Sequence, residues 1–185
     1  MPDAATGSRG RRRVRYQVAV SLDGYIAGPN GEVDWIVADP GIDFAALLEP
    51  FDTVLMGRRS WEETDAHPGM FPGMRVVVCS RTLRAEDHPG VTVAGDAAAA
   101  VDALRSGPGK DIWLFGGGEL FRSLLELDRV DTVEPAIVPV VLGGGRPLLP
   151  APAVRRRLKL AGHQVYPSGI VLLRYDVAPR GDASG

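Results

Sequence analysis

Three short segments of the sequence combine glycine, hydroxyl and guanidinium groups at points where an apolar run gives way to a helical pattern. They are Gly57-Arg58-Arg59-Ser60, Ser80-Arg81 and Gly116-Gly117-Gly118. The first backbone amides of a helix carry a partial positive charge, and glycine lets a ligand approach the backbone closely. Each segment is therefore typical of an anion-binding turn, and phosphate is the anion that this combination suits best.

The first two segments differ in the phosphate that they suit. Arg58, Arg59 and Ser60 add positive charge and a hydroxyl to one helix start, although a charged helix start with no ligand explains them equally well. A strand end that carries Ser80 together with Arg81 suits a phosphate monoester, such as the 2′-phosphate that distinguishes NADPH from NADH.

The third segment, Gly116-Gly117-Gly118, allows a pyrophosphate to lie against bare backbone at the start of a helix. The Rossmann pattern Gly-x-Gly-x-x-Gly fails here, because Phe121 occupies the place of the third glycine. A tight turn without a ligand is the alternative, and three consecutive glycines disfavour it. A dinucleotide would therefore require a different doubly wound arrangement.

The composition excludes several other kinds of chemistry. The 185 residues include one cysteine, so an internal disulfide and a zinc site with several thiolates are impossible. Gly109-Lys110 is followed by Asp111 instead of a hydroxyl residue, so the P-loop pattern fails. Each of the three histidines lies beside a proline or a glycine, which favours surface loops over metal ligation, and we expect no metal.

The charge pattern argues against a nucleic-acid partner. The net charge is −2, and five arginines lie within residues 1–15 against one aspartate, which leaves the rest of the chain acidic, whereas nucleic-acid binders present a basic face. We interpret residues 1–14 and 180–185 as tails and residues 15–179 as one domain. No apolar run is long enough for a secretory signal or a membrane span, so we expect a cytoplasmic protein without a membrane partner.

Short β-branched runs alternate with helical patterns along the chain. We expect strands over Arg15–Ser21, Thr53–Met56, Arg75–Cys79, Val91–Val93, Asp111–Phe115, Thr132–Val138, Leu158–Val165 and Ile170–Val177. Helices are expected over Asp43–Leu48, Arg59–Thr64, Ala97–Arg105 and Glu119–Glu126, with Asp96 capping the third.

This alternation predicts an α/β fold with a doubly wound, mostly parallel sheet. Apolar runs such as Val54-Leu55-Met56 are typical of parallel strands that are covered on both faces. Only Tyr166-Pro167-Ser168-Gly169 separates the last two strands, which is too short for a crossover helix, so the sheet should end in an antiparallel C-terminal hairpin.

Two long turn-rich stretches, Leu22–Gly41 and Asp65–Gly73, interrupt the alternation. Long loops in compact domains are more often functional than idle. The first stretch follows the carboxyl end of a predicted strand, and open α/β sheets bind their ligands at that edge. The arrangement is coherent for a dinucleotide and a small second ligand.

The sequence resembles the dihydrofolate-reductase-like superfamily, and within it the reductase domain of the bifunctional riboflavin-biosynthesis deaminase–reductase, here in a standalone form. The resemblance runs from about Arg15 to Val177, and it rests on six segments in the family's order. They are Ser21-Leu22-Asp23-Gly24-Tyr25-Ile26-Ala27, Gly31-Glu32-Val33-Asp34-Trp35-Ile36, Met56-Gly57-Arg58-Arg59-Ser60-Trp61-Glu62, Ser80-Arg81, Gly116-Gly117-Gly118-Glu119-Leu120 and Val140-Val141-Leu142-Gly143-Gly144-Gly145-Arg146-Pro147-Leu148.

The resemblance implies NADPH as cofactor and hydride transfer to a C=N or C=O carbon of a small pyrimidine- or pterin-type heterocycle, as in 5-amino-6-(5-phosphoribosylamino)uracil reductase. By position, Gly57, Arg58, Arg59 and Ser60 match the phosphate-binding turn, and Ser80 with Arg81 the contact to the 2′-phosphate. The pyrophosphate and the nicotinamide ribose would lie along Gly116, Gly117, Gly118, Glu119 and Leu120, and the nicotinamide ring near Ala19 and Ile26. The relatives also imply a homodimer.

On the substrate side the resemblance points to Asp23, Trp35 and Asp43. Folate reductases carry an acidic residue on the first helix that assists protonation, and Asp43 is the nearest match. An equally good explanation is that Asp43 only caps the helix that follows it. The Gly-x-x-x-Trp pattern at Gly31–Trp35 fits the riboflavin-type reductase better, whereas the zinc signature of its partner deaminase cannot exist with one cysteine.

Two alternatives remain open from the sequence. One is dihydrofolate reductase proper. The other is a nucleotide-binding module of this fold without turnover, which would keep the phosphate turns but lack a proton donor.

Overall fold

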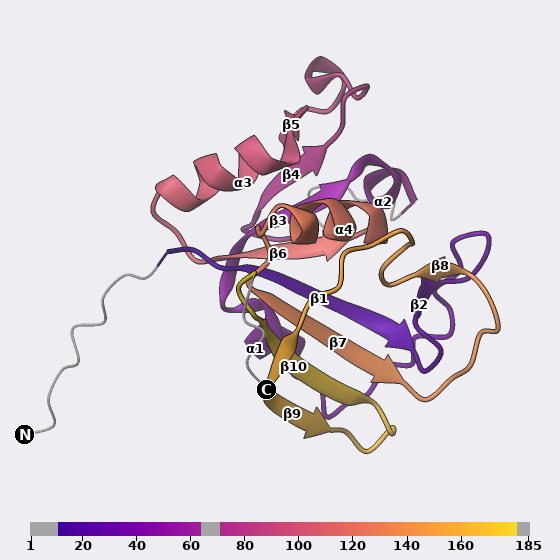
Figure 1. The fold of residues 1–185 in the computed structure, drawn as a ribbon. Coiled ribbons are helices and arrows are strands. Elements are labelled where there is room, and N and C mark those ends of the chain that lie inside the picture. Colours follow the sequence, from indigo (N-terminus) through magenta and orange to yellow (C-terminus); the bar gives the residue numbers. More distant parts are fainter. Residues whose placement is uncertain (1–10, 64–70, 181–185) are drawn as a thin grey trace, which may run out of the picture.

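The computed structural model describes residues 11–63 and 71–180, and over these residues the chain forms an eight-stranded mixed sheet (Figure 1). The strand order is β5-β4-β3-β6-β1-β7-β10-β9, and a short second sheet pairs β2 with β8. The large sheet comprises β1 (Val14–Ser21), β3 (Phe51–Gly57), β4 (Arg75–Cys79), β5 (Val91–Ala94), β6 (Asp111–Gly116), β7 (Thr132–Val138), β9 (Leu158–Val165) and β10 (Val171–Val177).

The pairing confirms the predicted fold class. All pairs among β5, β4, β3, β6, β1 and β7 are parallel, whereas β10 is antiparallel to β7 and β9 is antiparallel to β10. The six parallel strands therefore end at one edge of the sheet, which we call the carboxyl edge.

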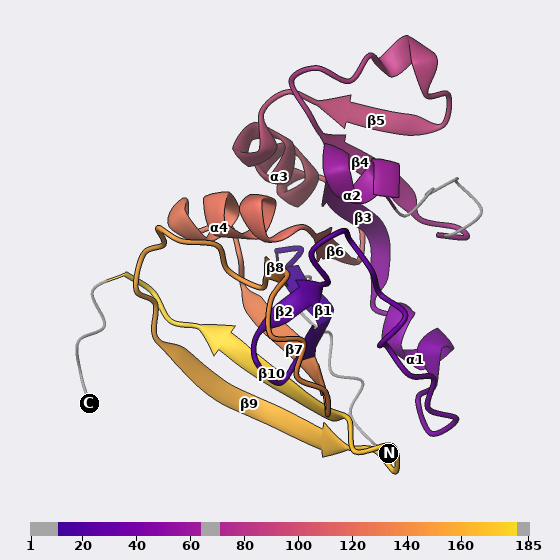
Figure 2. The same ribbon diagram turned by 90° about the vertical axis from the view of Figure 1, so that its right-hand side faces the viewer.

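Helices cover both faces of this sheet (Figure 2). They are α1 (Phe44–Leu48), α2 (Arg58–Glu63), α3 (Ala97–Ser106) and α4 (Gly118–Glu126), together with the short 3-10 helix η2 (Ala85–Asp87). Leu55 of β3 packs into the cluster formed with α3 and α4, while its neighbours Val54 and Met56 pack with Trp61 of α2. The continuous apolar run of β3 thus has a partner on each face, as expected for a buried parallel strand. No helix in the described part of the chain is long and apolar enough to cross a membrane.

Most predicted elements are present with shifts of one or two residues at their ends. Helix α3 begins where expected, because the Asp96 carboxylate accepts the amides of Ala98 (2.8 Å) and Ala99 (3.0 Å). The sequence did not indicate β2 (Tyr25–Ala27) and β8 (Arg146–Pro147), which pair antiparallel to each other. Thr64, the predicted end of α2, lies outside the described residues, as does most of the second turn-rich stretch.

The arginine run at the N-terminus is less of a tail than predicted. Arg12 is buried, and its guanidinium bonds Asp52 and, at 2.7 Å, the hydroxyl of Thr53. Strand β1 begins at Val14, one residue before the predicted domain boundary. Arg12 and Val14 are therefore packed in the fold, and the prediction of an N-terminal tail concerns residues 1–10, which lie outside the described residues.

The helix cap yields a first prediction. Replacing Asp96 with alanine removes two capping hydrogen bonds and should lower the free energy of unfolding by about 1 kcal/mol. Chemical denaturation measures the change, and Asp87→Ala, in the exposed η2 segment, serves as the control. Equal stability of the two variants would contradict the capping role.

Candidate functional site

Two of the predicted glycine turns meet at the carboxyl edge. Strand β6 pairs with β3 so that Met56 lies beside Gly116, and the turns that follow the two strands are therefore neighbours. A β-carbon at position 117 would lie only 3.3 Å from the hydroxyl oxygen of Ser60, and the peptide between Gly116 and Gly117 is cis. The structure thus brings Ser60 against the backbone of the triple-glycine segment.

The N-cap and the first residue of α4 are both glycines, Gly117 and Gly118. Gly117 is its N-cap and offers no side-chain hydrogen bond to the first-turn amides. A β-carbon at Gly118 would lie 2.6 Å from the carbonyl oxygen of Pro147, so only glycine fits at this position. Uncapped amides at a helix start are suited to an anion. In the first turn, Glu119 is exposed and pairs with Arg122 at 2.8 Å, whereas Leu120 packs against the core.

The arginines of the first turn lie at the surface, at the start of α2. Arg58 and Arg59 open α2 directly after Gly57, the last residue of β3, and both are exposed. The Nε of Arg58 is 3.7 Å from a carboxylate oxygen of Glu62, which is a loose pair between two half-exposed side chains. Such a pair is weak in water and leaves the guanidinium able to contact an anion.

The turn after β4 presents one cation. The Ser80 hydroxyl accepts the amides of Thr82 (3.2 Å) and Leu83 (2.9 Å), which fixes a tight turn with Arg81 exposed at its tip. Within the described residues Arg81 has no ion pair. Burial, aided by the charge of Asp96, raises the pKa of the preceding Cys79 thiol to about 12, which disfavours the thiolate that acts as a nucleophile.

Asp23 ties together two loops at the carboxyl end of β1. Its carboxylate accepts the Ser21 hydroxyl (2.7 Å) and the amides of Leu142 (3.1 Å) and Gly143 (2.7 Å). These bonds lower the pKa of Asp23, and the bond from the Ser21 hydroxyl has the largest effect. The side chain is thus engaged in holding the loop after β7, and its contact with a substrate stays a prediction.

The other predicted ring contacts gather on the sheet face opposite α3 and α4. Ala19 of β1 and Trp35 both pack against the cluster of Val138, Tyr166 and Ile170, and the Trp35 indole donates to the carbonyl of Glu32 at 3.0 Å. Ile26 lies on β2 and is partly buried. Ala19 and Trp35 therefore line one region of the structure.

Asp43 follows Ile42, which packs against the same cluster, but the Asp43 carboxylate serves as a helix cap. It is exposed, and its carboxylate accepts the amide of Ala46 at 3.0 Å as the N-cap of α1. This is the capping role that the sequence allowed. A catalytic role for Asp43 stays a prediction without a supporting contact.

Polar residues that belong to none of the glycine turns lie beside Ala19 on the same face of β1. The guanidinium of Arg15 donates two bonds of 2.8 Å to Glu134, which is buried. Between this pair and Ala19 stands Gln17, whose amide oxygen is buried without a hydrogen-bond partner among the described residues. Trp113 donates to the Gln17 backbone carbonyl at 2.9 Å, so the strand is fixed there while the side-chain amide is left open.

The segment around β8 closes over the carboxyl edge. Arg146 forms an ion pair with Glu63 at the end of α2, and its guanidinium lies close to Gly31. Together with the amides bound by Asp23, this pair joins the loop after β7 to β1, β2 and α2. The only sequence signal for it was the resemblance over residues 140–148.

Residues 12–172 match the RibD C-terminal domain family. The chain belongs to this family. The Bacillus subtilis protein YyaP is 35% identical over 183 residues, which cover 92% of this chain and 97% of YyaP.

Two solved structures have the same fold as this RibD C-terminal domain protein. A candidate riboflavin biosynthesis protein from Shewanella sp. PV-4 is 25% identical with a TM-score of 0.75, covering 92% of this chain and all of the other. The diaminohydroxyphosphoribosylaminopyrimidine deaminase/5-amino-6-(5-phosphoribosylamino)uracil reductase of Thermotoga maritima is 18% identical with a TM-score of 0.70. The similarity covers 91% of this chain and 57% of that longer protein.

The lowered pKa of Asp23 predicts how stability depends on pH. A carboxyl group whose pKa is lower in the folded than in the unfolded state stabilises the fold above the unfolded pKa, about 3.9, and loses this effect as the pH falls through the folded value. Asp23→Asn should therefore lower the melting temperature at neutral pH, and the gap to the unaltered protein should close in acid.

Thermal unfolding from neutral pH to strong acid measures this gap. Asp87→Asn, at an exposed position, is the control and should show no gap at any pH. A constant gap for Asp23→Asn across the range would show that ionisation of Asp23 does not stabilise the loop.

Proposed function

We propose that this protein is an NADPH-dependent reductase that transfers a hydride to a C=N or C=O carbon of a pyrimidine-type heterocycle. The observation that carries the proposal is the junction of two glycine turns, where the Ser60 hydroxyl lies against the backbone of Gly117, the N-cap of α4. Membership of the RibD C-terminal domain family supports a reductase of the riboflavin-pathway type.

The residues at the carboxyl edge fit the phosphates of a dinucleotide. Ser60, Arg58 and Arg59 would bind the pyrophosphate together with the first amides of α4, because hydroxyl, guanidinium and helix-start amide groups all donate hydrogen bonds to phosphate oxygens. Arg81, exposed and without an ion pair in the described part of the chain, would bind the 2′-phosphate, and the Ser80 hydroxyl can donate its proton to the same group. When bound, the nicotinamide supplies the hydride.

The protein's own contribution would be to position the substrate and to exclude water. Ala19 leaves room for a flat ring on β1, and Trp35 packs beside the same region. Gln17 presents an unpaired amide on the same face, two residues or about 7 Å along the strand from Ala19. An amide offers a donor and an acceptor together, which complements the N–H and C=O edge of a uracil-type ring.

Asp43 weighs against the folate-reductase alternative. A folate reductase needs a carboxyl group on the first helix to assist protonation, and in this structure the nearest match is exposed and caps α1.

We also propose a homodimer that forms through β9, an edge strand on which Leu158, Leu160 and Val165 are 43%, 52% and 66% exposed. Exposed apolar groups on an unpaired edge favour association.

Turnover assays distinguish the pyrimidine-type reductase, the folate reductase and the nucleotide-binding module without turnover. We expect NADPH oxidation, followed by absorbance, with 5-amino-6-(5-phosphoribosylamino)uracil and none with dihydrofolate. Oxidation with dihydrofolate alone would indicate a folate reductase. Saturable NADPH binding without oxidation of either substrate would indicate a nucleotide-binding module.

The role of Arg81 predicts a change in cofactor selectivity. Arg81→Ala should weaken NADPH binding by about ten- to a hundredfold, the worth of a charge-assisted hydrogen bond, and leave NADH binding nearly unchanged. Titration calorimetry measures both affinities. Arg84→Ala removes another arginine of the same loop, one that pairs with Glu86, and should change neither. Equal losses for NADPH and NADH in Arg81→Ala would exclude a 2′-phosphate contact.

The role of Gln17 predicts a change on the substrate side only. Gln17→Leu fills a similar volume without the amide and should raise KM for the uracil-type substrate about tenfold, the worth of one or two hydrogen bonds. The affinity for NADPH should not change, which separates a substrate contact from misfolding. Gln17→Asn, which keeps an amide, should lose less than Gln17→Leu. An unchanged KM in Gln17→Leu would remove Gln17 from the site.

A further inference from the structure

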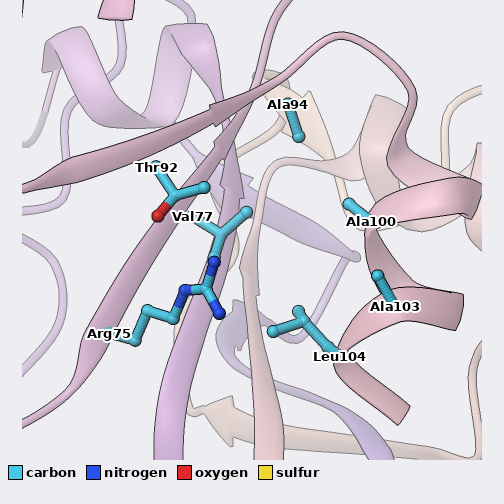
Figure 3. Close-up of a pocket in the computed structure, with 7 residues that line it drawn as sticks. All are labelled: Arg75, Val77, Thr92, Ala94, Ala100, Ala103 and Leu104. Carbon is cyan, nitrogen blue, oxygen red and sulfur yellow. The ribbon is translucent and has the colours of Figure 1, made fainter. Parts of the chain in front are cut away.

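A cavity of about 220 Å³, open to solvent on one side, lies between α3 and the outer strands β4 and β5 (Figure 3). Val77 of β4 and Ala94 of β5 form part of its floor, and Leu104 of α3 forms part of its wall. An apolar cavity of about 150 Å³ binds benzene. The space is therefore large enough for a six-membered ring that carries a small substituent.

The sequence of α3 explains why the space exists. The helix begins with four consecutive alanines, and Ala100 and Ala103 face the strands where longer side chains would fill the gap. Val101 and Leu104, which are buried, hold the helix against the sheet. Alanine is the strongest helix former, so these residues favour the helical conformation even where their short side chains leave space above β4 and β5.

One charged group belongs to this cavity. Arg75 lines it as the first residue of β4, and Figure 3 shows its side chain reaching along the strand towards Val77 and Leu104. Arg75 has no ion pair or side-chain hydrogen bond within the described residues. The other polar side chain of the lining is Thr92, which carries a hydroxyl. An apolar space beside an unpaired guanidinium suits a molecule with an apolar body and one anionic end.

We propose that this cavity is a second binding site, specific for small aromatic carboxylates of the benzoate type. The ring would lie between the alanines of α3 and Val77, and the carboxylate would receive two parallel N–H bonds from the Arg75 guanidinium. A planar carboxylate matches the fork of the guanidinium better than a single-point anion does. Neither uncharged rings nor acetate would satisfy both parts of the site.

The two ends of this cavity lie at different distances from the proposed cofactor site. Arg75 stands at the amino end of β4, whereas Ser80 follows its carboxyl end, five residues or about 16 Å along the strand. The other end of the cavity adjoins the Ser80 turn, because the carbonyl of Ala94 accepts the Ser80 amide at 2.9 Å. A benzoate whose carboxylate is bound by Arg75 should therefore remain bound when NADPH is present, and its binding does not require that the protein be a reductase.

Amide NMR of the full-length protein tests the proposal with benzoate as the probe. We expect shifts concentrated at Thr92, Ala94, Ala100 and Ala103 that saturate, and no comparable shifts with acetate or toluene. Arg75→Gln should weaken benzoate binding at least tenfold, while Arg84→Gln, a matched change at an exposed position, leaves it unaltered.

A second variant tests the cavity itself. Ala103→Met would fill the space and abolish the benzoate shifts, and Ala45→Met, the same change on the exposed side of α1, would not. If Ala103→Met fails to fold, the comparison of Arg75→Gln with Arg84→Gln still decides the question.

Three results would overturn the proposal. One is the absence of saturable benzoate shifts, and another is unchanged benzoate affinity in Arg75→Gln. The third is displacement of benzoate by NADPH with shifts at Gly57–Ser60, which would show that benzoate occupies the carboxyl edge instead.

Discussion

The parallel pairing of β6 with both β3 and β1 is the constraint on which the candidate site depends. It places the turn after β6 directly beside the turn after β3, with Gly116 in register with Met56. It also sets Ala19 and Gln17 of β1 on the same sheet face as Trp113 and its neighbours. If β6 lay at the edge of the sheet, the triple glycine and Ser60 would be separated. The strand order therefore accounts for the meeting of residues that lie almost 60 positions apart.

Close packing of backbone is the second requirement of this edge. Gly118 lies against the carbonyl of Pro147, and Gly117, the N-cap of α4, has no side chain to cap the first amides. The loop that makes this contact is held by polar ties, with the Asp23 carboxylate binding two of its amides and Arg146 pairing with Glu63. A ligand at the glycine turns would thus meet a surface that neighbouring loops have already fixed. Such preorganisation lowers the entropy that binding must overcome.

Local sequence patterns predicted the sheet, its antiparallel end and the positions of the glycine turns, because buried strands and helix caps depend on neighbouring residues. They did not reveal β2 and β8, since two or three residues carry no periodicity. Arg12 was interpreted as part of a solvated run because its partners, Asp52 and Thr53, are distant in sequence. Gln17 lies in a strand with no motif around it, and it is distinguished only by its buried side-chain oxygen, which has no hydrogen-bond partner among the described residues. The two explanations of Asp43 could be weighed only once its bond to Ala46 was known.

A dinucleotide bound where the turns after β3 and β6 meet would contact both glycine turns. Titration of the isotope-labelled protein with NADP+, followed by two-dimensional amide NMR, locates the binding site residue by residue. Saturable shifts should concentrate at Gly57–Ser60 and Gly116–Gly118, with weaker effects at Ser80 and Arg81. Shifts confined to the opposite edge of the sheet, around Arg75 and Lys110, or no saturable shifts at either glycine turn, would show that no dinucleotide binds at this junction.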